Sequence, residues 1–168
     1  MRFGQEVQEM PRPLSLPPPS ADTPSFEAFR AALERLDADT LPAWGVLDAA
    51  GMLRHCARFM ELYLGSIGVH SGVRLLARWF GPMFLRRFIV KPLGMTPRHM
   101  KTLQSIRAQE QDVRGFEDER AAFLAAMAGV EALEGLVEHG LYGWMKAEDA
   151  KALVRHHTAH HFHQFGLL

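Results

Sequence analysis

KAEDAKALVRHHTAHHFHQF, residues 146–165, predicts a closing helix that carries five of the nine histidines of the chain. On a helical wheel with about 100° between successive residues, His157 and His161 share a face with Leu153 and Val154. A helix of a globular protein buries such an apolar face. We therefore expect His157 and His161 to point into the protein.

Two histidines four residues apart project side by side from a helix, and their imidazole nitrogens can bind one zinc-like ion at about 2.0–2.1 Å. An apolar face offers few other partners for four ring nitrogens. A specific metal site is therefore one interpretation of His157 and His161. The other is a solvated, histidine-rich surface that collects adventitious ions. His156 and His160 have the same spacing, so the register of the pair stays open.

A third ligand is expected from a second helix, which Asp48 can cap and Gly65 can end. His55 lies in this helix beside Phe59, on the shoulder of the apolar stripe. A shoulder position points between helices, so His55 is the best candidate. Three weaker candidates lie in predicted loops or at helix boundaries, namely His70, His99 and His139.

Three further helices are predicted from apolar spacing and strong helix formers. They cover residues 26–37 after a capping hydroxyl in Thr23-Pro24-Ser25, residues 73–90 with a kink or break at Gly81-Pro82, and residues 117–133 with an acidic first turn. No strand-like alternation competes with these helices. Because the connections are short, we expect an all-α, up-and-down four-helix bundle with extra short helices over residues 23–168.

Residues 1–22 are rich in proline and small polar residues, so we expect a flexible, disordered tail there. The chain has no signal-like start, and its most apolar later stretch is interrupted by arginines, which favours a cytoplasmic protein without a membrane span. Lys+Arg and Asp+Glu both number 19, so a nucleic-acid partner is not expected. The single cysteine, Cys56, points away from His55 and is expected to be a core thiol.

Two separated stretches resemble the DinB/YfiT superfamily of metal-dependent enzymes, in a branch whose members have no settled reaction. The first is WGVLDAAGMLRHCARFMELYLG, residues 44–65, which is similar to that family's second helix with an inward histidine. The second is HGLYGWMKAEDAKALVRHHTAHHFHQFG, residues 139–166, which resembles the closing helix in which histidines four apart precede a glutamine. The middle of the chain matches only in length and helical content.

The resemblance implies that His55, His157 and His161 are the metal ligands, with His160 and Gln164 as nearby support. The additional histidines His156 and His163 depart from the pattern and keep the register alternative open. Three histidines leave a coordination position for water or substrate, as in catalytic sites. Imidazole suits several divalent ions, of which zinc or nickel is expected first and iron is an alternative.

Family likeness alone implies a thiol-dependent transferase or a hydrolase that acts on a small molecule, with a low-molecular-weight thiol as one candidate partner. A first alternative is a metal-binding or sensing bundle without enzymatic activity. A second is an interaction module that uses the apolar residues of 73–90, in a homodimer or at a membrane surface, although membrane binding is not expected.

Overall fold

The computed structural model describes residues 12–89 and 113–168. Within these ranges the fold is mainly helical, as the sequence predicts, with one small sheet. The order of elements is α1 (Phe26–Leu33), α2 (Ala49–Tyr63), α3 (Ser71–Ile89), α4 (Phe116–Glu131), β1 (Leu136–His139), β2 (Gly143–Lys146) and α5 (Ala147–Gln164). His99 lies outside the described residues.

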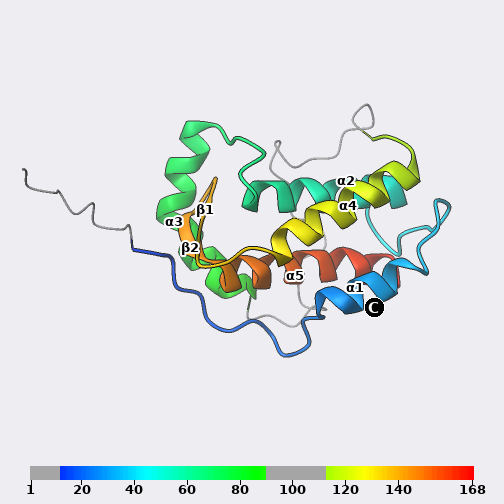
Figure 1. The fold of residues 1–168 in the computed structure, drawn as a ribbon, viewed down its shortest axis with the longest axis horizontal. Helices are drawn as coiled ribbons and strands as arrows, with labels where there is room; N and C mark the ends of the chain where they lie inside the picture. The colour runs from blue at the N-terminus through cyan, green and yellow to red at the C-terminus, as the bar shows by residue number, and fades with distance from the viewer. Residues whose placement is uncertain (1–11, 90–112) are drawn as a thin grey trace, which may run out of the picture.

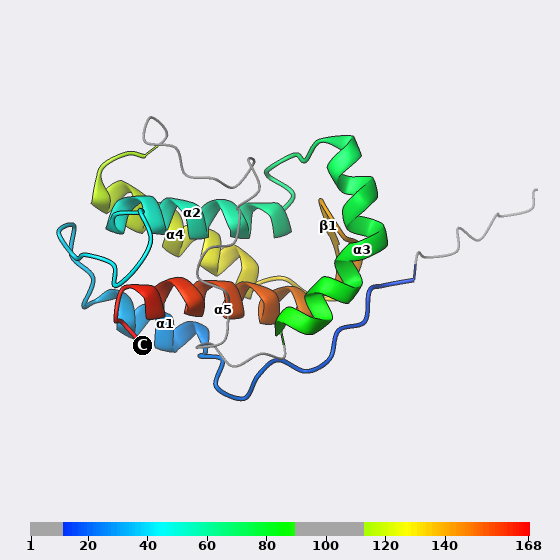
Figure 2. The ribbon, with the colours of Figure 1, turned by 180° about the vertical axis from the view of Figure 1, so that it is seen from behind.

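Four helices form two layers around the core. Figures 1 and 2 show α2 and α4 side by side above α5 and α1. The Phe162 ring of α5 lies edge-on to Phe29 of α1 at 5.3 Å and stacks on Phe123 of α4 at 5.7 Å, and all three side chains are fully buried. Aromatic pairs at these separations are worth about 0.5–1.5 kcal/mol beyond their burial, so this cluster fixes α5 against both neighbours.

The ends of the helices follow the capping residues that the sequence offers. The Ser25 hydroxyl accepts from Ala28 N at 3.2 Å, and the Asp48 carboxylate accepts from Gly51 N at 2.7 Å. Gly65 and Gly166 follow α2 and α5 with φ of +71° and +68°, which only glycine adopts without steric cost. The second and the closing helix therefore begin and end close to their predicted positions.

The predicted up-and-down four-helix bundle is not confirmed, because α3 does not run alongside the other helices. It stands at an angle to them, at the end of the molecule that carries the hairpin (Figure 2). α3 is not broken at Pro82, since it runs as one helix from Ser71 to Ile89, but its axis bends along its length (Figures 1 and 2). Much of its apolar surface is exposed, at Leu75, Leu76, Trp79, Phe80, Met83 and Phe84.

The expectation that the chain has no strands is wrong. β1 and β2 pair antiparallel, with Val137 opposite Met145 and His139 opposite Gly143. The two strands have four residues each, too short for a clear alternating pattern, and their turn-rich composition predicted a loop. The hairpin connects α4 to α5 and so sets where the closing helix begins.

Part of the predicted flexible tail is extended along the fold. Leu14 N donates to Trp144 O at 2.7 Å, and Leu14 forms a parallel bridge with Met145 of β2. The Leu14 and Leu16 side chains pack against the hydrophobic core. These two leucines give residues 12–22 apolar surface to bury. The sequence prediction of a tail rested on the prolines of this segment and did not weigh the two leucines. Residues 1–11 lie outside the described part of the chain.

None of the helices in residues 12–89 and 113–168 combines the length and the apolar character that crossing a membrane requires.

Candidate metal centre

Three histidines from two helices converge between the layers. His55 comes from α2, and His157 and His161 come from one face of α5. Each can offer a ring nitrogen such that all three atoms lie within 4.8 Å of one another. Nε2 of His55 lies 3.2 Å from Nε2 of His157. Among the described residues, these three side chains are therefore close enough together to bind one metal ion.

One nitrogen separation matches a tetrahedral ion. Two ligands at 2.0–2.1 Å from such an ion lie about 3.3 Å apart, close to the 3.2 Å between His55 and His157. His161 completes the triangle, with ring centroids 4.7 Å from His55 and 4.8 Å from His157. Its ring nitrogen lies within 4.8 Å of the other two. The group contains no carboxylate or thiolate from the described residues, so three imidazoles are the donor set.

Gln164 connects His161 to the loop before α2. Its Oε1 lies 2.9 Å from Nδ1 of His161, and its Nε2 donates to the carbonyl oxygen of Trp44. Because the amide nitrogen is committed to a carbonyl, Oε1 must accept, and Nδ1 of His161 carries the hydrogen. Nε2 of His161 then presents a lone pair toward the other two histidines, which is the form that a metal binds.

Gly45 allows this arrangement. It has φ of +89°, and a Cβ at this position would collide with Nε2 of Gln164. Ala43 N also donates to the carbonyl of Gln164 at 2.8 Å, so the loop is held to the C-terminal end of α5 at two points. A residue with a side chain at position 45 would displace the amide that orients His161.

Packing holds the His157 ring. Phe59, one turn after His55 on α2, stacks on it with centroids 3.7 Å apart and planes within 9°. Nδ1 of His157 is buried and has no hydrogen-bond partner in the described part of the chain. Unlike His161, His157 therefore has no hydrogen bond at Nδ1 that orients its ring, and its stacking on Phe59 holds it instead.

The two imidazoles that α5 contributes to the group, His157 and His161, are held neutral. Burial lowers the pKa of His161 to about 3, against the opposing effect of its hydrogen bond to Gln164. Burial also lowers the pKa of His157 well below its usual value, and the neighbouring histidines lower it further. A metal competes with the proton for the same lone pair, so neutral rings bind without first losing a proton at pH 7.

The other histidines of α5 lie elsewhere. His163 is exposed, and the His160 ring lies 5.2 Å from His161 and 6.2 Å from Trp44. His156 is fully buried. Asp22 lies near enough for its charge to oppose the effect of burial on the His156 pKa. The segment predicted as a tail therefore passes close to His156 of α5.

The alternative pair, His156 and His160, is not the pair that meets His55, because neither residue belongs to the converging group. His70 and His139 are also outside it. Cys56 is a core thiol as predicted: it is fully buried, its sulfur lies 3.9 Å from that of Met52, and burial raises its pKa. Sequence reasoning missed Trp44 and Gly45 as supports of Gln164, although a glycine after the tryptophan is visible in the sequence.

No protein-family model, curated protein or solved structure matches this chain. A functional conclusion therefore rests on the geometry of the chain's own residues.

Proposed function

We propose that His55, His157 and His161 bind one divalent metal ion and that the protein is a metal-dependent enzyme acting on a small molecule. The observation that carries the proposal is the convergence of three imidazoles, two of them held neutral, on one point between α2 and α5. Zinc or nickel is the first choice, with iron as the alternative.

An open coordination position supports catalysis over a purely structural role. Three protein ligands leave at least one position of a tetrahedral ion for water or substrate, whereas structural zinc sites use four. His157 and His161 each keep part of their surface exposed to solvent. A metal bound here would lower the pKa of a bound water or thiol, or polarise a carbonyl.

Membership of the DinB/YfiT superfamily is part of the same proposal. It is supported by the residues that the resemblance assigns, because His55, His157, His161 and Gln164 lie together in the structure. The reaction classes that the resemblance implies are thiol-dependent transfer and hydrolysis. A metal-binding or sensing bundle without activity is the alternative within the same site.

Metal-reconstituted protein tests the catalytic role directly. We expect the zinc- or nickel-loaded protein to turn over either a low-molecular-weight thiol with an electrophilic acceptor or an activated ester or amide, and the His161→Ala variant to lose that activity. His163→Ala is the matched control, since His163 is exposed on the same helix. Full metal occupancy with no turnover in either assay would contradict the enzyme and favour the sensing bundle.

A second candidate function is self-association through α3. Among the described side chains of this helix, seven large apolar ones are exposed, including Trp79 at 78% and Met83 at 70%, and patches of this kind mark interaction sites. The formal net charge of zero also leaves no overall repulsion between copies. We propose that two chains pair through this surface.

Sedimentation velocity tests the pairing. The wild type is expected to sediment as a dimer and Trp79→Glu as a monomer, because the substitution places a charge in the apolar contact. Val46→Glu is the control, since Val46 is 99% exposed in the loop before α2. A monomeric wild type, or equal dimerisation of both variants, would refute this role, and binding to liposomes instead would point to a membrane surface.

A further inference from the structure

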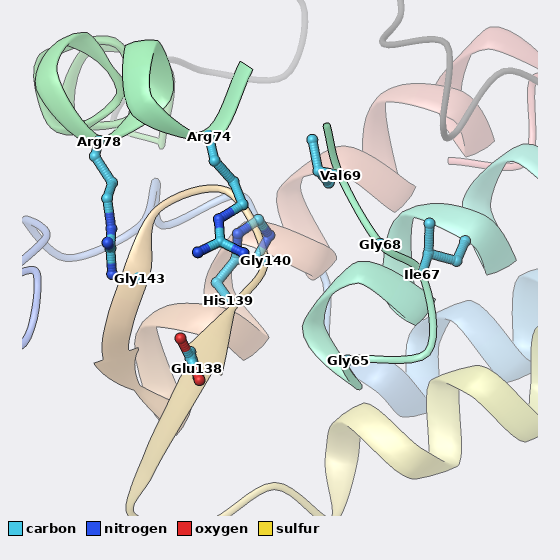
Figure 3. A pocket seen from close by; sticks show the side chains of 10 residues that line it. All are labelled: Gly65, Ile67, Gly68, Val69, Arg74, Arg78, Glu138, His139, Gly140 and Gly143. Atoms are coloured by element: carbon cyan, nitrogen blue, oxygen red, sulfur yellow. The ribbon is translucent and has the colours of Figure 1, made fainter. Parts of the chain in front are cut away.

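A second site lies between α3, the segment after α2 and the β1–β2 hairpin. It is a cavity of about 210 Å³ whose charged and polar lining groups are Arg74, Arg78, Glu138 and His139 (Figure 3). Four of the ten lining residues are glycines, which leave backbone exposed to a ligand. His139 packs on Tyr63, two turns after His55 on α2, so this cavity is separate from the three converging histidines.

His139 carries a buried hydrogen-bond donor beside this cavity, of which it is a lining residue. It is 2% exposed, and its Nδ1 accepts from Leu141 N at 3.0 Å and from Tyr142 N at 3.3 Å. A ring nitrogen that accepts from backbone N–H groups carries no hydrogen. Burial lowers the His139 pKa to about 3, so the neutral ring carries its hydrogen on Nε2. That N–H has no acceptor among the described residues.

Two arginines reach the same cavity from α3. Arg74 and Arg78 are four residues apart, so they project from one side of the helix toward the turn of the hairpin (Figure 3). No carboxylate of the described residues lies within salt-bridge distance of either guanidinium. Glu138 is the one acidic residue of the lining, which leaves an excess of positive charge.

Close packing places the arginines at the turn. The Tyr142 ring stacks on His139 at 4.8 Å and also lies against Gly81 of α3, where a Cβ would collide with the ring. The Arg78 guanidinium in turn lies against Gly143, where a Cβ would be 3.1 Å from its nitrogen. Two glycines, one on α3 and one on β2, therefore fix the position of the arginines relative to His139.

We propose that this cavity binds an oxyanion, a carboxylate or phosphate group of a small molecule, held by the guanidinium groups of Arg74 and Arg78 and by the Nε2–H of His139. Arginine forks match the paired oxygens of both groups, and a buried neutral N–H adds a directed donor. Glu138 lowers the positive potential and so weakens the binding of dianions. The site does not depend on the proposed metal centre.

Calorimetric titration of the full chain with inorganic phosphate, and separately with acetate, at constant ionic strength tests the proposal. We expect saturable binding of at least one anion, and the tighter of the two identifies the group. Arg74→Gln and Arg78→Gln should each weaken it about tenfold or more, the loss expected for a charge-assisted hydrogen bond. Both arginines are exposed, so these variants should keep the fold. Arg87→Gln, the same change elsewhere on α3, should bind like the wild type.

Two further variants test separately the hydrogen-bond donor of His139 and the negative charge of Glu138. His139→Asn keeps an acceptor near the position of Nδ1 for the turn but removes the Nε2–H, so it should weaken anion binding, and Glu138→Gln should strengthen it. His161→Ala should leave phosphate binding unchanged, which distinguishes this cavity from a metal-bound anion. In the wild type, the ¹⁵N signal of His139 Nε2 should shift on titration. No saturable binding of either anion, or equal binding by the Arg78→Gln and Arg87→Gln variants, would overturn the proposal.

Discussion

Replacing His161 by alanine is expected to abolish stoichiometric binding of a divalent metal, and His55→Ala and His157→Ala are expected to do the same. Each substitution removes one of three imidazoles that converge within 4.8 Å, and two remaining ligands do not make a tight site. Elemental analysis of untagged protein after dialysis against trace metal gives the stoichiometry. We expect about one ion per wild-type chain and well below a tenth in each variant.

His163→Ala is the matched control for this experiment. It removes an imidazole from the same histidine-rich helix, but His163 is exposed and outside the converging group. If metal binding were only the scavenging expected of a histidine-rich surface, all four variants would lose similar, partial amounts. Equal retention across the four variants would therefore contradict a specific centre.

Replacing Gln164 by leucine is expected to weaken metal binding by about 10–100-fold, the usual cost of removing a hydrogen bond that orients a ligating histidine. Leucine has a similar volume but can neither accept from Nδ1 of His161 nor donate to the Trp44 carbonyl. His161 would then lose the partner that fixes its tautomer. Competition with a chelator of known affinity measures the change in dissociation constant.

Gln164→Glu separates the two hydrogen bonds. The carboxylate still accepts from Nδ1 of His161 but cannot donate to Trp44, so metal affinity should stay within a few fold of the wild type while the loop is held less firmly. Thermal unfolding of the metal-free proteins gives the contribution of the loop contact. Equal losses of metal affinity in the leucine and glutamate variants would show that Gln164 acts by packing and not by orienting His161.

The helices that build the centre were predictable because their signals are local. Asp48 caps α2 through its own side chain, and glycines with positive φ follow α2 and α5, so four-residue patterns locate these ends. The inward face of α5 follows from Leu153 and Val154, and it selects His157 and His161. For His55, the sequence indicated only a position at the edge of the apolar stripe of α2. The structure was needed to show that this side chain faces α5.

What the sequence did not predict depends on contacts between distant segments. The hairpin is stabilised by its strand pairing and by Leu14, more than 120 residues away, and neither effect leaves a pattern in four-residue strands. The charge of Asp22, in a segment whose prolines predicted a tail, similarly acts on the buried His156 side chain of α5. The hydrogen-bonded turn that fixes the His139 ring also forms only once the hairpin exists.

An anomalous-scattering crystal structure of the protein loaded with zinc, collected at the zinc edge, tests the central claim most directly. We predict one strong peak in the anomalous difference map, at about 2.0–2.1 Å from one ring nitrogen each of His55, His157 and His161. A non-protein ligand should complete the coordination sphere of the ion. A peak held instead by His156, His160 or His163, or no ordered peak between α2 and α5, would contradict it.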